Sequence, residues 1–202
     1  WQAVRRALPA DTTLGFVPTM GNLHAGHMTL VEQSMRDNTK TIVSLFVNPT
    51  QFNRPEDFNT YPKTLDADLK QLEQAGVDYC LMPAADVLYA DNYRYQLDET
   101  ERSLMMEGKH RPGHFAGVLT VVMKFFQLVR PTHAYLGEKD YQQLMLIQGM
   151  IDAFFLDIKL CACPTFREPS GLAYSSRNNR LSDEGREQAD TFARLFHAAT
   201  SC

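Results

Sequence analysis

The strongest constraint on the fold is the alternation of strand-like and helix-like segments along most of the 202-residue chain. Runs rich in β-branched and aromatic residues, such as TIVSLFV, predict buried strands, and runs with apolar residues at helical spacing predict helices. Strands are predicted at 14–19, 41–47, 77–82, 133–137 and 158–165, with a short further strand at 93–98. Helices are predicted at 26–38, 64–76, 118–129, 141–155 and 183–199.

This order predicts an α/β fold, a Rossmann-like, doubly wound parallel sheet with helices on both faces. Gly76 is a suitable C-terminal stop for its helix, and Ser182 is a suitable cap for the last helix. In such sheets ligands bind at the carboxyl ends of the strands, in the turns that lead into the helices. Those turns are therefore where the chemistry is expected.

Composition excludes several classes of partner. The net charge of −4 provides no basic field for nucleic acid or an anionic membrane, and no apolar run approaches the roughly 20 residues of a membrane helix. Cys80, Cys161, Cys163 and Cys202 form no CxxC pair, and Cys161 and Cys163 alternate on one face of a predicted strand. With no secretory signal, we expect reduced thiols and a cytoplasmic protein, in a chain trimmed at both ends.

The turn PTMGNLHAGH places His24 and His27 three residues apart, beside Gly21 and Gly26. Backbone N–H groups and the helix dipole meet at such a turn and attract phosphate. Histidines there can donate hydrogen bonds to phosphate oxygens and neutralise a departing group. Two alternatives stay open: ordinary turn histidines, or a metal site, for which no third ligand lies nearby in the sequence.

Two further turns carry polar groups. Asn48 and Gln51, in NPTQF, are neutral amides that can bind hydroxyls and carboxylates, or they belong to a polar turn fixed by Pro49. The segment GKHRPGHFAGV gathers positive charge in an acidic chain, which favours an anion site over a solvated loop. Its basic residues are Lys109, His110, Arg111 and His114.

In LGEKDYQQL, Lys139 is an anion contact or a surface lysine, Asp140 is a candidate cap, and either Gln142 or Gln143 can contact a substrate. The last turn, GLAYSSRN, offers hydroxyls and a guanidinium suited to phosphate, or it is a flexible hinge. These groups are Ser175, Ser176 and Arg177. Together the turns predict a nucleoside triphosphate site beside a small polar substrate.

Five segments, PTMGNLHAGH, FVNPTQF, RPGHFAGV, GEKDYQQL and GLAYSSRN, occur in the order that they have in the pantothenate synthetases, the pantoate–β-alanine ligases. They extend over residues 15–182, nearly the whole chain. The segment HAGH alone is shared with the wider HxGH nucleotidyltransferase class, which includes class I aminoacyl-tRNA synthetases. The five together are specific, and the sequence resembles this family.

The resemblance implies two steps. ATP and pantoate give pantoyl adenylate and pyrophosphate, and the amine of β-alanine then attacks to give pantothenate and AMP, with Mg²⁺ assisting. It also implies a homodimer and two domains: residues 1–180 bind nucleotide and pantoate, and residues 181–202 begin a C-terminal lid whose remainder is absent. The alternatives are another HxGH enzyme, such as a cytidylyltransferase, and a catalytically silent nucleotide-binding module.

The resemblance also implies the site residues. Those expected to stabilise charge during adenylation are His24, His27, Lys139 and Arg177. Those expected to bind ATP are Met20, Gly21, Asn22, Leu23, His24, Ala25, Gly26, His27, Gly137, Glu138, Lys139, Asp140, Phe166, Tyr174, Ser175, Ser176 and Arg177. Gln51 and Gln143 match substrate-contacting glutamines, and Asp68 falls near the position linked to the metal. Tyr174 stands where the family usually carries Leu or Met.

Overall fold

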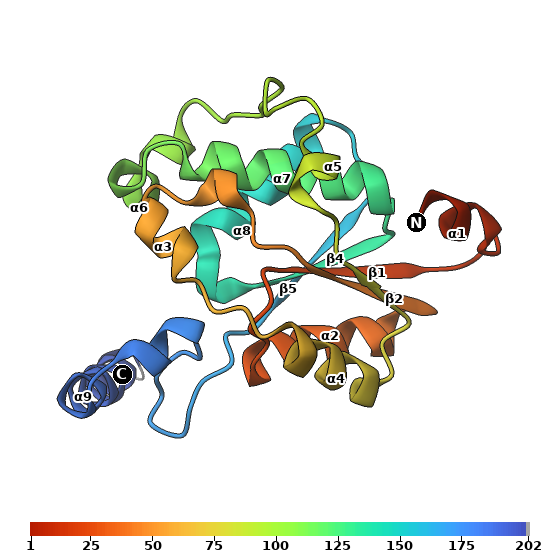
Figure 1. Ribbon diagram of the computed structural model, residues 1–202. Helices are drawn as coiled ribbons and strands as arrows, with labels where there is room; N and C mark the ends of the chain where they lie inside the picture. The colour runs from red at the N-terminus through yellow and green to blue at the C-terminus, as the bar shows by residue number, and fades with distance from the viewer. Residues whose placement is uncertain (201–202) are drawn as a thin grey trace.

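The computed structural model describes residues 1–200, and within them five strands form one parallel sheet (Figure 1). The order across the sheet is β3-β2-β1-β4-β5, and every neighbouring pair is parallel. The α/β fold with a parallel sheet is therefore confirmed. The strands are β1 (Leu14–Thr19), β2 (Lys40–Leu45), β3 (Tyr79–Leu81), β4 (His133–Gly137) and β5 (Lys159–Cys163).

Helices cover both faces of the sheet (Figure 1). On one face lie α2 (Ala25–Asp37) and α4 (Leu65–Ala75), and on the other lie α7 (His114–Val129) and α8 (Tyr141–Ala153). The last helix, α9 (Asp183–Thr200), lies beside the sheet rather than on it. Shorter elements are α1 (Gln2–Ala7), α3 (Pro55–Asn59), α5 (Ala85–Leu88), α6 (Met106–His110) and the 3₁₀ turns η1 (Pro49–Gln51), η2 (Arg102–Leu104), η3 (Glu138–Asp140) and η4 (Ser176–Arg180).

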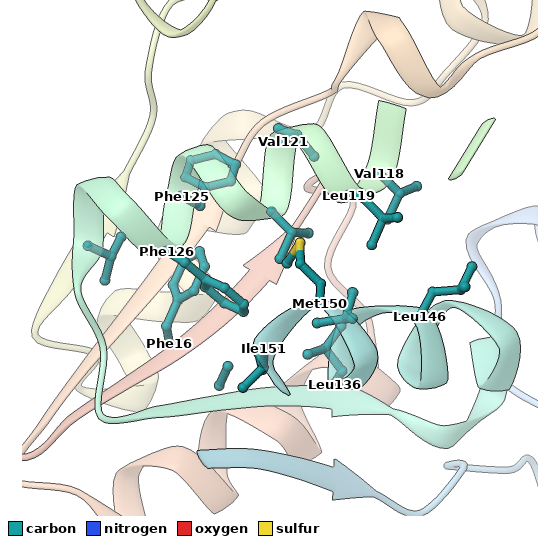
Figure 2. Packing of buried hydrophobic residues seen from close by; sticks show 14 of the residues in the cluster. Phe16, Val118, Leu119, Val121, Phe125, Phe126, Leu136, Leu146, Met150 and Ile151 are labelled. Atoms are coloured by element: carbon teal, nitrogen blue, oxygen red, sulfur yellow. The ribbon is translucent and has the colours of Figure 1, made fainter. Parts of the chain in front are cut away.

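The two faces bury separate cores because neighbouring residues of a strand point to opposite sides. Phe16 of β1 packs against Phe125 and Phe126 of α7, with ring centroids 5.7 and 6.4 Å apart (Figure 2). The next residue, Val17, is fully buried on the α2/α4 face with Val31. Burial of one such side chain contributes roughly 1.5–3 kcal/mol.

Local signals set most element ends. Gly76 ends α4 in the left-handed region at φ 80°, and the Ser182 hydroxyl accepts a hydrogen bond from Gly185 N at the start of α9. The strand predicted at 93–98 is wrong, because Leu97 N donates to the Thr120 hydroxyl on α7 instead of pairing with a strand. Asp140 stands at the N-cap of α8, but its side chain makes no capping bond.

The prediction that Cys161 and Cys163 lie on one face of a strand is confirmed. Cys80, Cys161 and Cys163 are free, and all three belong to the core on the α2/α4 face. Cys202 lies outside the described residues. Within residues 1–200, no helix has the length and apolar character needed to cross a bilayer.

Candidate active site

A cavity of about 240 Å³ opens at the carboxyl ends of the strands. The strand order reverses between β1 and β4, and a crevice is expected at such a reversal because the two flanking crossovers leave in opposite directions. Most of the predicted site residues line this cavity. They are Met20, His24, Gly26, His27, Gln51, Gly137, Lys139, Asp140, Gln143, Phe166, Tyr174, Ser175, Ser176 and Arg177.

The two histidines of the first turn lie against each other. His24 is the N-cap residue of α2, and its ring stacks on that of His27 with centroids 4.0 Å apart and planes at 28°. Gly26 permits this arrangement, because a Cβ at that position would lie 3.1 Å from His24 Cε1. The pair is thus placed at the amino end of a 13-residue helix, where the helix dipole favours anions.

Both histidines are neutral at neutral pH. Burial, followed by the charges of His24 and Lys139, lowers the pKa of His27 to about 3. Burial and then Lys139 also lower the pKa of His24. Within residues 1–200, the Nδ1 atoms of both rings are buried and have no hydrogen-bond partner. These lowered pKa values favour neutral, hydrogen-bonding histidines in the structure without ligand, and their role in adenylation stays a prediction.

The turn before the histidines is anchored by Asp68. Gly21 and Asn22 both adopt positive φ, at 75° and 51°. This backbone turns the N–H groups of Asn22 and Leu23 to α4, where each donates to an Asp68 carboxylate oxygen at 2.8 Å. The Thr64 hydroxyl lies 3.1 Å from both of those oxygens. Asp68 is 2% exposed, so a buried carboxylate fixes the path of the turn.

This geometry bears on two parts of the sequence interpretation, which stay predictions. The oxygens of Asp68 are occupied by N–H and hydroxyl donors, which argues against a metal ligand there. In the described part of the chain, no group of three or more His, Cys, Asp or Glu side chains is placed to hold a metal ion. Five residues expected at the ATP site do not line the cavity: Gly21, Asn22, Leu23, Ala25 and Glu138.

The two amide side chains of the second turn, Asn48 and Gln51, have different surroundings. Asn48 is 1% exposed and holds the turn by accepting from the Tyr89 hydroxyl at 2.7 Å and donating to Gly117 O at 3.2 Å. Gly117 is required there, since a Cβ would lie 2.4 Å from Thr50 O. Gln51 lines the cavity, and its amide nitrogen lies 2.8 Å from the Met20 sulfur. Of the two amides, Gln51 is therefore the candidate substrate contact.

The structure also separates the two glutamines of α8. Gln143 lines the cavity. Gln142 instead binds the loop before α6, donating to the Arg102 and Met105 carbonyl oxygens at 2.9 Å and accepting from Glu107 N at 3.0 Å. Gln143 is therefore the candidate substrate contact, and Gln142 is structural.

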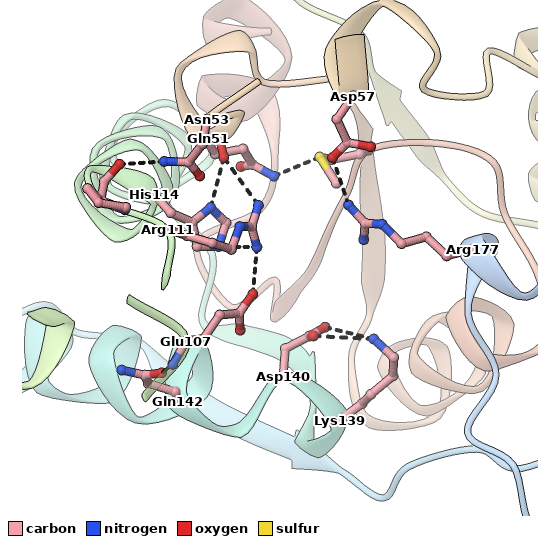
Figure 3. A network of polar contacts seen from close by, with 12 residues as sticks. Gln51, Asn53, Asp57, Glu107, Arg111, His114, Lys139, Asp140, Gln142 and Arg177 are labelled. Atoms are coloured by element: carbon pink, nitrogen blue, oxygen red, sulfur yellow. Dashed lines mark hydrogen bonds and ion pairs between the residues drawn. The ribbon is translucent and has the colours of Figure 1, made fainter. Parts of the chain in front are cut away.

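Three cations of the cavity are paired with carboxylates (Figure 3). Lys139 lies 3.2 Å from Asp140, Arg177 lies 3.1 Å from Asp57, and Arg111 lies 2.5 Å from Glu107. Arg111 and His114 line the cavity, whereas Lys109 and His110 do not, so half of the predicted basic segment contributes. Such partly exposed pairs are weak, and each of the three cations keeps further N–H donors that can bind an anionic ligand.

Aromatic rings line the cavity beside His24. Tyr174 lies between His24 and Phe166, with ring centroids 5.4 Å and 5.6 Å away, respectively. The backbone supports this arrangement, because Tyr174 N donates to Phe166 O at 3.0 Å. These rings provide an apolar surface of the kind on which a planar base stacks.

Several residues of the site were not predicted from the sequence, and three of them are polar or charged groups with a clear position. Glu107 and Tyr61 line the cavity, and Asp57 pairs with Arg177. Tyr61 and Asp57 come from the segment after Gln51, whose short helix α3 has no apolar periodicity to reveal it. Only the three-dimensional contact between this segment and η4 shows that it belongs to the site.

Comparison with known proteins decides the family. The sequence matches the family described as pantoate-beta-alanine ligase over residues 1–201. The chain belongs to the pantoate–β-alanine ligase family. It is 60% identical over 197 residues to a pantothenate synthetase of Legionella pneumophila (strain Lens), covering 98% of this chain and 78% of the relative. A pantothenate synthetase of Coxiella burnetii (strain Dugway 5J108-111) is 50% identical over 202 residues, covering 100% of this chain and 78% of that relative.

Solved structures agree with this assignment. The pantoate-beta-alanine ligase of Francisella tularensis, complexed with beta-gamma ATP and beta-alanine, superposes with a TM-score of 0.93 at 44% identity, over 96% of this chain and 75% of that one. A pantothenate synthetase from Thermus thermophilus gives 0.89 at 44% identity, over 96% and 70%. The chain is thus a ligase that joins pantoate to β-alanine.

Proposed function

We propose that this enzyme uses ATP to activate pantoate as pantoyl adenylate. A pantoate carboxylate oxygen attacks the α-phosphorus, the bond to the β-phosphate oxygen breaks, and pyrophosphate leaves. The amine of β-alanine then attacks the acyl carbon, AMP leaves, and the amine loses a proton. The observation that carries the proposal is one cavity lined both by groups able to bind phosphate, such as His27 and Arg177, and by two neutral glutamines.

The side chains divide the work by position. His24 and His27 stand at the start of α2, where neutral N–H donors can bind oxygens that gain charge as pyrophosphate departs. Lys139 and Arg177 supply positive charge from two other turns. No covalent enzyme intermediate is needed, so orientation and charge stabilisation account for the rate.

Pantoate is assigned to the side of the cavity lined by Gln51 and Gln143. Neutral amides hold hydroxyl and carboxylate groups by hydrogen bonds without adding a positive charge. Arg111, which donates to Gln51 O, is paired with Glu107, and this offsets a charge that would otherwise weaken the pantoate carboxylate as a nucleophile. Phe166 and Tyr174 provide the apolar wall for adenine at the other side.

In this proposal Mg²⁺ binds together with ATP, through the phosphates of the nucleotide. The described residues offer no ligand cluster for a resident metal, whereas Mg²⁺ commonly binds through substrate phosphates and water with few protein ligands. Each step above is therefore assigned to residues of the chain.

Isotope exchange between pyrophosphate and ATP tests the first step. Exchange is expected with pantoate alone and does not require β-alanine, because adenylation precedes amide formation. Matched reactions with unrelated carboxylic acids are the control. Equal exchange with those acids contradicts pantoate as the substrate of adenylation.

We propose that the enzyme is a homodimer. Leu104, Met105, Met106 and Tyr141 are 58–72% exposed, and the bonds from Gln142 to the loop hold them near one another. An exposed apolar cluster of this kind is typical of an interface between chains. Light scattering during size exclusion measures the mass, and Met106→Lys is expected to shift it to the monomer.

Two further proposals concern the C-terminal domain and the cellular location. We assign residues 181–202 to a C-terminal lid domain, supported by α9, whose Phe192 and Leu195 are 70% and 66% exposed. Proteolytic cleavage before α9 that leaves the sheet domain intact supports this boundary.

We also propose a cytoplasmic location, supported by free thiols in residues 1–200 and tested by cell fractionation.

A further inference from the structure

One carboxylate joins the segment after Gln51 to the loop that carries Arg177. Asp57 of α3 accepts hydrogen bonds from Arg177 Nη2 at 3.1 Å and from Arg180 Nη1 at 3.3 Å. Arg180 Nη2 also donates to Thr60 O at 3.1 Å. Both arginines belong to η4, 120 or more residues away in the sequence, so these bonds connect two distant segments, each of which also supplies residues to the cavity.

The charges around Asp57 keep it ionised at neutral pH. Burial alone would raise the pKa of this carboxyl, but hydrogen bonds and charges from Arg177 and then Arg180 hold it below its usual value. Two guanidinium groups share this one carboxylate, so the contact retains a net positive charge at the mouth of the cavity.

Arg177 depends on this contact for its position. Its side chain is 54% exposed, and a long exposed arginine loses substantial rotamer entropy when it is ordered. In the described part of the chain, Asp57 is the hydrogen-bond partner that the structure gives to the Arg177 guanidinium. Figure 3 shows Arg177 extended toward Asp57, whereas Lys139 points to Asp140.

We propose that Asp57 is a positioning residue for ATP: it holds the Arg177 guanidinium at the mouth of the cavity, ready to receive a phosphate. This inference rests on the proposed role of Arg177 in nucleotide binding. Asp57 itself acts through Arg177 and does not touch the reacting atoms. Arg180, its second partner, holds α3 against η4, and Arg177 uses only Nη2 on Asp57, so its other N–H groups remain available to a phosphate.

The test is the Asp57→Asn variant, measured by pantoate-dependent pyrophosphate exchange. The KM for ATP is expected to rise about two- to fivefold, the range for losing an exposed ion pair, with the KM for pantoate and kcat nearly unchanged. Asp57→Glu, which keeps the charge, is expected to restore most of the ATP affinity. Glu56→Gln, at the exposed carboxylate next to it, is the matched control. An unchanged KM for ATP overturns the inference, and so does a lower one, which would mean that Asp57 competes with phosphate.

A double-mutant comparison separates this inference from the proposed function. Arg177→Ala is expected to raise the KM for ATP, and adding Asp57→Asn to it is expected to cause no further change. If Arg177→Ala raises the KM but Asp57→Asn does not, the positioning role alone is wrong. If Arg177→Ala leaves the KM unchanged, the nucleotide role of Arg177 and the inference both fail.

Discussion

At the scale of single residues, the protonation state of the histidines decides how they act. The pKa of His27 is lowered to about 3, so it is neutral at pH 7, and its proposed role is to stabilise phosphate by donating a hydrogen bond. His27→Ala is expected to lower the rate of adenylation by roughly 100-fold, the usual loss for one such donor. His27→Gln keeps a neutral donor and is expected to retain more activity, measured by pyrophosphate exchange. Equal loss in both variants contradicts a neutral donor.

The adjacent glutamines of α8 provide a matched pair at the same scale. Gln143→Ala is expected to raise the KM for pantoate several-fold, because it removes a polar contact worth roughly 0.5–1.5 kcal/mol, with little effect on the KM for ATP. Gln142→Ala removes the bonds to the Arg102 and Met105 carbonyls and is expected to change the ordering of α6 instead. Steady-state kinetics with each substrate varied in turn measures the difference. A larger pantoate effect for Gln142→Ala reverses the assignment.

At the scale of elements, Asp68 of α4 fixes the path of the β1–α2 turn, which leads to His24 and His27. Asp68→Asn replaces one acceptor oxygen by an amide group, which leaves one buried N–H of Asn22 or Leu23 without a partner. The free energy of unfolding is expected to fall by about 1–3 kcal/mol, and adenylation is expected to fall with it. Urea unfolding without Mg²⁺ measures this, with the exposed Asp66→Asn as control.

The same experiment separates an anchor from a metal ligand. A metal ligand predicts normal stability without Mg²⁺ and a higher Mg²⁺ requirement in the Asp68→Asn variant. An anchor predicts lower stability that Mg²⁺ does not restore, because the bonds that are lost go to backbone N–H groups.

The sequence predicted elements whose signal is local and missed contacts whose signal is not. Strands such as β1 and helices such as α4 carry their own apolar pattern and end signals, and the turns that follow parallel strands meet at one edge. The alternation at 93–98 resembles a strand, but its backbone binds Thr120 of α7. The low pKa of His27 could not be predicted, because it depends on burial and on Lys139, which is 112 positions along the chain.

At the scale of the whole molecule, the fold partly or fully shields three histidines that line the cavity. Burial is the largest cause that lowers the pKa of His24, His27 and His114, so folding holds all three neutral. In the unfolded chain each returns to the usual value of 6.5. The unfolded state therefore binds more protons below that pH, and acid favours unfolding.

The free energy of unfolding is thus expected to fall as the pH decreases from about 6.5, by up to about 1.4 kcal/mol per pH unit for each such histidine. His27 continues to contribute down to its folded pKa of about 3. Asp91, whose pKa is lowered to about 2, changes the free energy of unfolding mainly below pH 3.8, the usual pKa of an aspartate. Other carboxyl groups with lowered pKa values behave in the same way. Urea unfolding at pH 7 and pH 5 therefore isolates the histidines. His27→Gln is expected to reduce the difference between the two values, and Asp91→Asn to leave it unchanged. An equal difference in wild type and His27→Gln means that His27 is not held neutral by folding.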